Sequence, residues 1–143
     1  MSTTKKLRVA VVGAGILGSR HARVFAEQPD CELIAVVDIN SARAEQAAQT
    51  HGARAFTDYE AMLRSVEVDA VAIATPDHLH CAPVVTALRA GKHVFVEKPL
   101  ATTAQDSRDM VAAAASAKAA PEKMMPQSVM NSPCKLATPT VSV

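Results

Sequence analysis

Short, continuous apolar runs alternate with amphipathic stretches along most of this chain. The runs are rich in Val, Ile and Ala, and they predict buried strands at residues 7–12, 32–38, 53–56, 69–74 and 93–97. The stretches between them have helical spacing, and they predict helices at residues 16–27, 40–50, 79–90 and 102–119, with a short one from residue 57. Strands that are apolar on both faces and alternate with helices form parallel sheets covered on both sides. The sequence therefore predicts an α/β fold with a doubly wound parallel sheet.

Two capping-box patterns predict where helices begin. Thr57 is followed three residues later by Glu60, and Thr102 is followed three residues later by Gln105. In such a box the hydroxyl accepts from a backbone N–H of the first turn, and the later side chain returns to the capping residue. We therefore expect Thr57 and Thr102 to cap their helices.

Composition excludes several classes of partner. The formal net charge of +1 comes from acids and bases dispersed along the chain, so neither nucleic acid nor a membrane surface is an expected partner. No apolar run reaches the length of a membrane span or a secretory signal. Cys31, Cys81 and Cys134 are widely spaced and form no CxxC pair, which predicts reduced thiols in a cytoplasmic protein. The five histidines share no ligand spacing with cysteine or acid, so no metal site is expected.

The character of the chain changes after residue 120. Four prolines fall within 19 residues, at Pro121, Pro126, Pro133 and Pro139, with Ser, Thr and Met between them. Such a stretch contributes little to a core. We therefore expect one domain over residues 1–120 and an irregular, partly disordered tail over residues 121–143.

A glycine-rich turn joins the first predicted strand to the first predicted helix. GAGILG fits the pattern GxGxxG, and Asp38 ends the next strand 20 residues after Gly18. This is the full context of a dinucleotide-binding fingerprint in a Rossmann-type fold, in which free N–H groups and the positive end of the helix dipole hold a diphosphate. We expect this turn to bind the diphosphate of a nicotinamide dinucleotide cofactor. It consists of Gly13, Ala14, Gly15, Ile16, Leu17 and Gly18.

Asp38 and its neighbour Ile39 lie where the ribose of the adenosine is expected. A carboxylate there accepts hydrogen bonds from the ribose hydroxyls and repels a 2′-phosphate, which favours NAD over NADP. Arg43 lies five residues further on and partly offsets this preference. The alternative for Asp38 is a polar group that only caps the end of its strand.

Two polar loops follow the fourth and fifth strands, and both reach the same edge of the sheet. The first loop, TPDHLH, provides Thr75, Pro76, His78 and His80, which we expect to contact the cofactor or a substrate. A surface or helix-capping histidine is the simpler alternative for His78 and His80. Because ligands of such sheets bind where the winding reverses, the loops indicate one site with the glycine turn.

The second loop is Glu97-Lys98-Pro99, in which Glu97 and Lys98 are further candidates for contact with the cofactor. An amine at Lys98 would lie near the nicotinamide end of the cofactor, where it could position or protonate a reacting oxygen. From the residues alone, a solvated lysine is the more common reading and a catalytic one is the alternative. A cis peptide bond before Pro99 is also an option.

Taken together, these motifs resemble the Gfo/Idh/MocA oxidoreductases, which include glucose-fructose oxidoreductase and inositol dehydrogenase. The resemblance rests on VAVVGAGILGSRHARVF, the strand ending in Asp38, and ATPDHLHCAPVVTALRAGKHVFVEKPLATT, and it covers residues 7–119. It implies NAD(P)-dependent hydride transfer at a hydroxyl carbon of a sugar, a cyclitol or a related compound. It also implies that Lys98 contacts both cofactor and substrate and is catalytic. The resemblance therefore favours a catalytic Lys98 over a solvated one, contrary to the interpretation from the residues alone.

The resemblance implies a two-domain protein, in which a second domain carries the substrate pocket and the surface used for oligomer assembly. No counterpart of that domain is expected in this chain, and residues 123–133 resemble an eroded version of the family's sixth strand. We therefore expect a truncated or frame-shifted, catalytically incomplete cofactor domain that meets a polyol or sugar only if a second domain is supplied. The alternatives are a non-enzymatic NAD-binding or regulatory module and a non-functional fragment.

Overall fold

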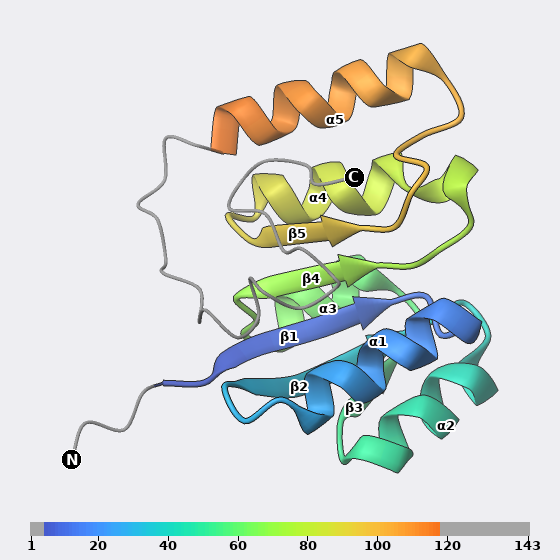
Figure 1. The fold of residues 1–143 in the computed structure, drawn as a ribbon, viewed down its shortest axis with the longest axis vertical. Helices are drawn as coiled ribbons and strands as arrows, with labels where there is room; N and C mark the ends of the chain where they lie inside the picture. Colours follow the sequence, from blue (N-terminus) through green and yellow to red (C-terminus); the bar gives the residue numbers. More distant parts are fainter. Residues whose placement is uncertain (1–4, 118–143) are drawn as a thin grey trace.

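A parallel sheet is the centre of the computed structural model, which describes residues 5–117. Its strands have the order β3-β2-β1-β4-β5, and every neighbouring pair is parallel (Figure 1). The chain starts at the centre, moves outward to β3, and then returns to add β4 and β5 on the other side. This confirms the predicted α/β class and the doubly wound topology. The strands are β1 Leu7–Val12, β2 Cys31–Val37, β3 Arg54–Phe56, β4 Ala70–Ile73 and β5 His93–Val96.

Helices cover both faces of this sheet. In Figure 1, α1 and α2 lie in front of the strands and α3 lies behind them. One apolar cluster joins the sheet to α1 and α2, and a second joins it to α3, α4 and α5. Because each face is covered, the strands are apolar on both sides, as their sequences indicated. The helices are α1 Ile16–Glu27, α2 Ser41–His51, α3 Tyr59–Ser65, α4 Cys81–Arg89 and α5 Ala104–Ala117, with a 3₁₀ turn η1 at Asp77–Leu79.

The helix predicted at residues 79–90 is divided in the structure. A 3₁₀ turn at Asp77–Leu79 comes first, and α4 begins two residues later at Cys81. The residue between them, His80, is 1% exposed, and its ring contacts backbone carbonyl groups instead of capping the helix. Periodicity of apolar residues did not show this interruption, which coincides with the tertiary contacts of the His80 side chain.

Both predicted capping residues were wrong by one position. Asp58, not Thr57, caps α3, and its carboxylate accepts from the backbone N–H of Glu60 at 3.0 Å. Thr103, not Thr102, caps α5, and its hydroxyl accepts from the backbone N–H of Asp106 at 3.1 Å. In each case a neighbouring side-chain oxygen is equally suited to the role, so spacing alone cannot choose between them.

At the amino ends of the central strands, Arg8 of β1 forms a network with two acids. Its Nε and Nη2 donate to the carboxylate of Asp69, each at 3.0 Å, and its backbone N–H donates to the same carboxylate. Its Nη1 donates to the more exposed Glu67 at 2.7 Å. These hydrogen bonds raise the pKa of Arg8, and the guanidinium lowers the pKa of Glu67. The network fixes β1 against the start of β4, at the opposite end of the sheet from the predicted site.

Cys31 is buried at the start of β2, where we expect it to resist alkylation. Burial raises the pKa of its thiol to about 11, with a smaller contribution from Asp30. At pH 8 about one such thiol in a thousand is ionised, and the thiolate is the reactive form. Iodoacetamide at pH 8, followed by peptide mass spectrometry, should leave Cys31 unmodified in the folded chain and modify it in urea. Rapid modification of Cys31 without urea would contradict its burial.

Several predictions concern residues that the structure does not describe. These are the irregular tail at residues 121–143, the eroded sixth strand at residues 123–133, and Cys134. Within the described part of the chain, no helix has both the length and the apolar character that a membrane span requires.

Candidate functional site

A crevice of about 590 Å³ opens at the carboxyl ends of β1, β2 and β4. This is the edge toward which the strand arrows point in Figure 1. The winding of the sheet reverses between β1 and β4, and ligands of doubly wound sheets bind at that point. The lining includes many of the residues expected there: Gly13, Gly15, Ile16, Leu17, Asp38, Ile39, Thr75 and Pro76.

Each of the three glycines of the turn has different surroundings at the position that a side chain would occupy. Gly13 has a φ of +99°, and a Cβ there would lie 2.6 Å from the carbonyl oxygen of Ala74. A Cβ at Gly18 would lie 1.6 Å from the carbonyl oxygen of Gly13, so α1 approaches the strand end closely there. Gly15, by contrast, has nothing within 4 Å of the same position. Gly13 and Gly18 are therefore required by the packing of the chain itself, whereas Gly15 leaves space in the crevice.

Asp38 lies directly beside this turn. Its Oδ2 accepts a hydrogen bond from the backbone N–H of Ala14 at 2.9 Å, and its Oδ1 accepts from the N–H of Asn40 at 2.8 Å. Ala14 itself is buried and does not line the crevice. The carboxylate thus joins the glycine turn to the start of α2, while Asp38 also lines the crevice wall.

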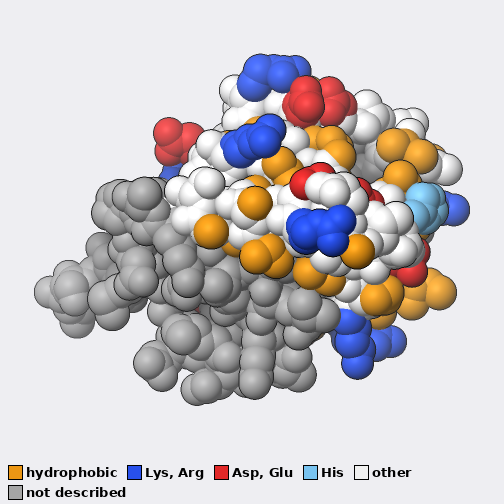
Figure 2. Space-filling view, turned by 90° about the horizontal axis from the view of Figure 1, so that it is seen from above, with side chains coloured by type: hydrophobic (Ala, Val, Ile, Leu, Met, Phe, Trp, Pro, Cys, Tyr) orange, Lys and Arg blue, Asp and Glu red, His pale blue; other side chains and the backbone are white. Residues whose placement is uncertain are grey.

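Large apolar side chains are exposed around the crevice. Ile16, Leu17, Ile39 and Leu79 are among the few large hydrophobic residues that the described chain exposes, and all four line it. Ile39 is 91% exposed. Figure 2 shows hydrophobic side chains, interspersed with charged ones, on the side of the molecule toward which the strands of Figure 1 point. Apolar walls of this kind suit a flat aromatic ring such as a nucleobase.

Sequence reasoning did not assign several further residues of the crevice wall. Arg43, Thr57, Tyr59 and Leu79 come from loops and helices whose approach to the crevice depends on the tertiary arrangement. Only Arg43 carried a signal, as a cation near the end of the second strand. The Thr75 hydroxyl is buried and has no hydrogen-bond partner among the described residues.

The second predicted loop, after β5, lies beyond this crevice. Neither Glu97 nor Lys98 lines it, and Lys98 is exposed, with no ion pair to any described residue. The Glu97 carboxylate is hydrogen-bonded to Nε2 of His21 on α1, and so it is held by the protein itself. The Lys98–Pro99 peptide bond is cis, which was one of the expected options.

The two histidines of the loop after β4 have different surroundings. His78 is exposed, lies outside the crevice lining, and has Nδ1 3.7 Å from the carboxylate of Asp77. His80 is buried, and both of its ring nitrogens face backbone carbonyl groups. The structure thus places His80 beneath the two predicted loops, with its ring against the backbone of both.

A family model described as "Oxidoreductase family, NAD-binding Rossmann fold" matches residues 7–121. This chain belongs to the Gfo/Idh/MocA family. The match includes the glycine turn, Asp38 and both predicted loops, so the predicted resemblance is confirmed. The domain described here is the NAD-binding Rossmann domain of that family.

Curated Gfo/Idh/MocA relatives are similar to this chain over most of its length. D-glucoside 3-dehydrogenase of Escherichia coli K12 is 38% identical over 110 residues, which is 76% of this chain and 31% of the relative. An inositol 2-dehydrogenase of Rhodococcus erythropolis is 41% identical over 117 residues, with 80% and 34% covered. The chain therefore spans about a third of the length of these relatives.

Solved structures of Gfo/Idh/MocA enzymes share the fold. The WlbA dehydrogenase of Bordetella pertussis, in complex with NADH and UDP-GlcNAcA, has a TM-score of 0.75 at 33% identity, and the match covers 80% of this chain and 35% of that one. The scyllo-inositol dehydrogenase of Lactobacillus casei, with bound NAD(H) and scyllo-inositol, has a TM-score of 0.76 at 30% identity, with 80% and 34% covered.

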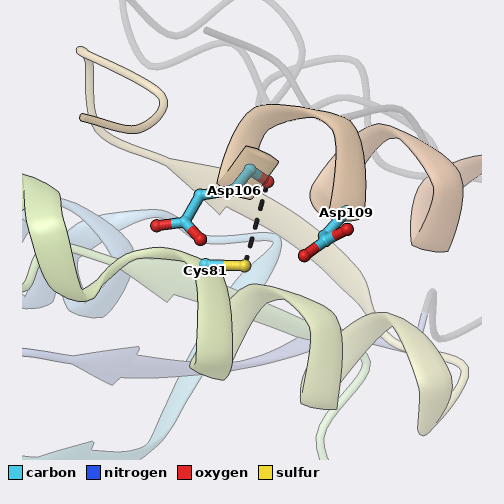
Figure 3. A group of neighbouring side chains, drawn as sticks. All are labelled: Cys81, Asp106 and Asp109. Atoms are coloured by element: carbon cyan, nitrogen blue, oxygen red, sulfur yellow. Dashed lines mark hydrogen bonds between the residues drawn. The ribbon is translucent and has the colours of Figure 1, made fainter. Parts of the chain in front are cut away.

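One cluster of potential ligands lies outside the crevice of this Gfo/Idh/MocA domain. Cys81 of α4 faces Asp106 and Asp109 of α5, and the three side chains offer ligand atoms within 4.8 Å of one another. The Cys81 thiol donates to the backbone oxygen of Asp106 at 3.8 Å (Figure 3). Burial, followed by the two carboxylates, raises the pKa of the thiol, and this favours the protonated form over the thiolate that binds metals. Sequence spacing did not indicate this group, and its geometry is that of a helix–helix contact.

Proposed function

We propose that this domain binds NAD in the crevice, as the cofactor half of an oxidoreductase that acts on a hydroxyl group of a sugar or cyclitol. The observation that carries the proposal is the open space at Gly15, next to the N-terminus of α1. Backbone N–H groups at a helix N-terminus are an anion site, and the missing side chain lets a diphosphate approach them.

The rest of the crevice fits the two ends of such a cofactor. Asp38 is placed to accept from ribose hydroxyls, and Ile39 and Leu79 offer apolar surface for the adenine. From there the molecule would extend across β1 toward β4 and β5, past Thr75 and Pro76, which line the crevice. The nicotinamide end then approaches Lys98.

Bound nicotinamide supplies the hydride acceptor or donor of the reaction. The role we assign to Lys98 is to hold or donate a proton at the substrate oxygen whose carbon exchanges hydride. Its ammonium is exposed and has no ion-pair partner among residues 5–117, so it is available for this contact. Support for the substrate class comes from the relatives, which are named for glucoside and inositol oxidation.

Cofactor preference is the first test of this proposal. Calorimetric titration with NAD and NADP should show at least tenfold tighter binding of NAD, because a charged hydrogen bond contributes about 1.5–3 kcal/mol and a 2′-phosphate would lose it. Asp38→Asn keeps one acceptor oxygen and removes the charge, so it should reduce the preference to about threefold or less.

Two results would contradict parts of this proposal. Equal affinity of the unsubstituted chain for NAD and NADP would overturn the preference but leave the site in place. A folded chain that binds neither dinucleotide, and does not bind ADP-ribose either, would overturn the cofactor site.

A further inference from the structure

Two buried histidines contact the loop that carries Lys98, one from each side. His21 belongs to α1, and His80 lies between η1 and α4. They are 3% and 1% exposed. Neither lines the crevice, so they act on it through the residues they touch.

His21 fixes the residue before Lys98. Its Nε2 is hydrogen-bonded to Oε1 of Glu97, and its ring meets the ring of Phe95 edge-on, with 5.2 Å between the centroids. Glu97 directly follows β5, and α1 begins beside the glycine turn. The helix whose N-terminus faces the proposed diphosphate therefore also holds the end of β5.

His80 fixes the residues after Lys98. Its Nδ1 lies 3.1 Å from the carbonyl oxygen of Pro99 and 3.2 Å from that of Leu100, while its Nε2 lies 2.8 Å from the carbonyl oxygen of Thr75. Carbonyl oxygens only accept, so a ring N–H must donate in each hydrogen bond that forms. The ring of His80 thus lies between the loop after β4 and the loop after β5, in contact with both.

We propose that His21 and His80 are positioning residues that hold Lys98 next to the place where the nicotinamide of the cofactor is expected, beyond the β4 side of the crevice. The inference rests on the proposed function, because it assigns the two histidines to the same site. Lys98 is itself exposed and unpaired with described residues, so its long side chain depends on the backbone on either side for its placement. Anchors on both neighbours limit the directions in which the ammonium points, and such pre-organisation strengthens contacts with a ligand.

Comparison of two ligands separates this role from a general effect on folding. NADH carries the nicotinamide, whereas ADP-ribose contains only the part expected at the glycine turn and Asp38. His21→Leu removes the hydrogen bond to Glu97, and His21→Gln retains an amide donor near the position of Nε2. We expect His21→Leu to weaken NADH binding about five- to tenfold, with ADP-ribose binding changed less than twofold and with recovery in His21→Gln.

His80→Leu should give the same pattern, and a thermal melt shows which variants fold. Should His80→Leu not fold, His80→Gln and the His21 pair supply the same comparison. Lys98→Met and His21→Leu together form a double-mutant cycle. The double variant should bind NADH no more weakly than Lys98→Met alone, because the histidine acts through the lysine.

The outcomes separate the two proposals. Equal losses for NADH and ADP-ribose, no recovery in His21→Gln, or additive losses with Lys98→Met would overturn the positioning role while leaving the cofactor site intact. Failure of the unsubstituted chain to bind ADP-ribose would instead overturn the proposed function.

Discussion

Replacing Gly18 with alanine should strongly destabilise the fold. The added Cβ would lie 1.6 Å from the carbonyl oxygen of Gly13, which is backbone and cannot rotate away. The first turn of α1 would have to move off the end of β1, with loss of the packing between them. Overpacking of this kind costs about 3 kcal/mol or more, and we expect the melting temperature to fall by about 12 °C or more.

The same substitution at Gly15 is the matched control, because it adds one methyl group to the same turn. Nothing lies within 4 Å of that Cβ, so Gly15→Ala should keep the fold and melt within about 3 °C of the unsubstituted chain. It should nevertheless weaken the binding of both NAD and ADP-ribose about tenfold or more, because the methyl group occupies the space next to the amides of the proposed diphosphate site. The pair thus separates a folding requirement from a binding requirement.

Either half of this comparison can fail. If Gly18→Ala melts like the parent chain, the close approach of α1 to β1 is wrong. Unchanged binding of ADP-ribose by Gly15→Ala would mean that the diphosphate does not lie against this turn, and the cofactor site would have to be placed elsewhere.

Loss of the Asp69 carboxylate should be the second most damaging change. Asp69 accepts from two side-chain nitrogens and the backbone N–H of Arg8, in a largely buried position. Asp69→Ala leaves the guanidinium without this partner, and removal of one member of a buried ion pair typically costs about 3–5 kcal/mol. Urea unfolding followed by circular dichroism should show a loss of about 3 kcal/mol.

Glu67→Ala provides the comparison for Asp69, because it removes the other acid bound to the same guanidinium. The Glu67 side chain is 84% exposed, and exposed ion pairs contribute about 1 kcal/mol or less. A Glu67 variant as unstable as the Asp69 variant would show that the exposed acid, and not the buried one, fixes β1 to the start of β4.

Local patterns were enough to predict the sheet and the turn. Each strand is a continuous apolar run bounded by turn residues. The glycine turn, the strand before it, the helix after it and Asp38 all lie within about 30 residues. Contacts of this short range leave their whole signature in one stretch of sequence. The bounds of β1 and α1 were accordingly predicted to the residue.

Other features depend on residues far apart in the chain, and these were missed. His21 and Glu97 are separated by 76 positions, and His80 meets Pro99 across 19. Neither partnership follows a periodicity or a motif, since both arise from how α1 and α4 pack on the finished sheet. For the same reason the crevice residues Tyr59 and Leu79 were not assigned.

The double engagement of Asp38 has a consequence for attempts to redesign this domain. A carboxylate proposed to distinguish NAD from NADP is usually treated as freely exchangeable. The carboxylate of Asp38, however, also accepts hydrogen bonds from the backbone N–H groups of Ala14 and Asn40. Removal of the side chain to admit an extra phosphate would leave the Ala14 amide without this acceptor and loosen the glycine turn, which is the proposed diphosphate site. A changed preference therefore requires a replacement such as serine or asparagine, which drops the charge yet still offers an oxygen to the amide.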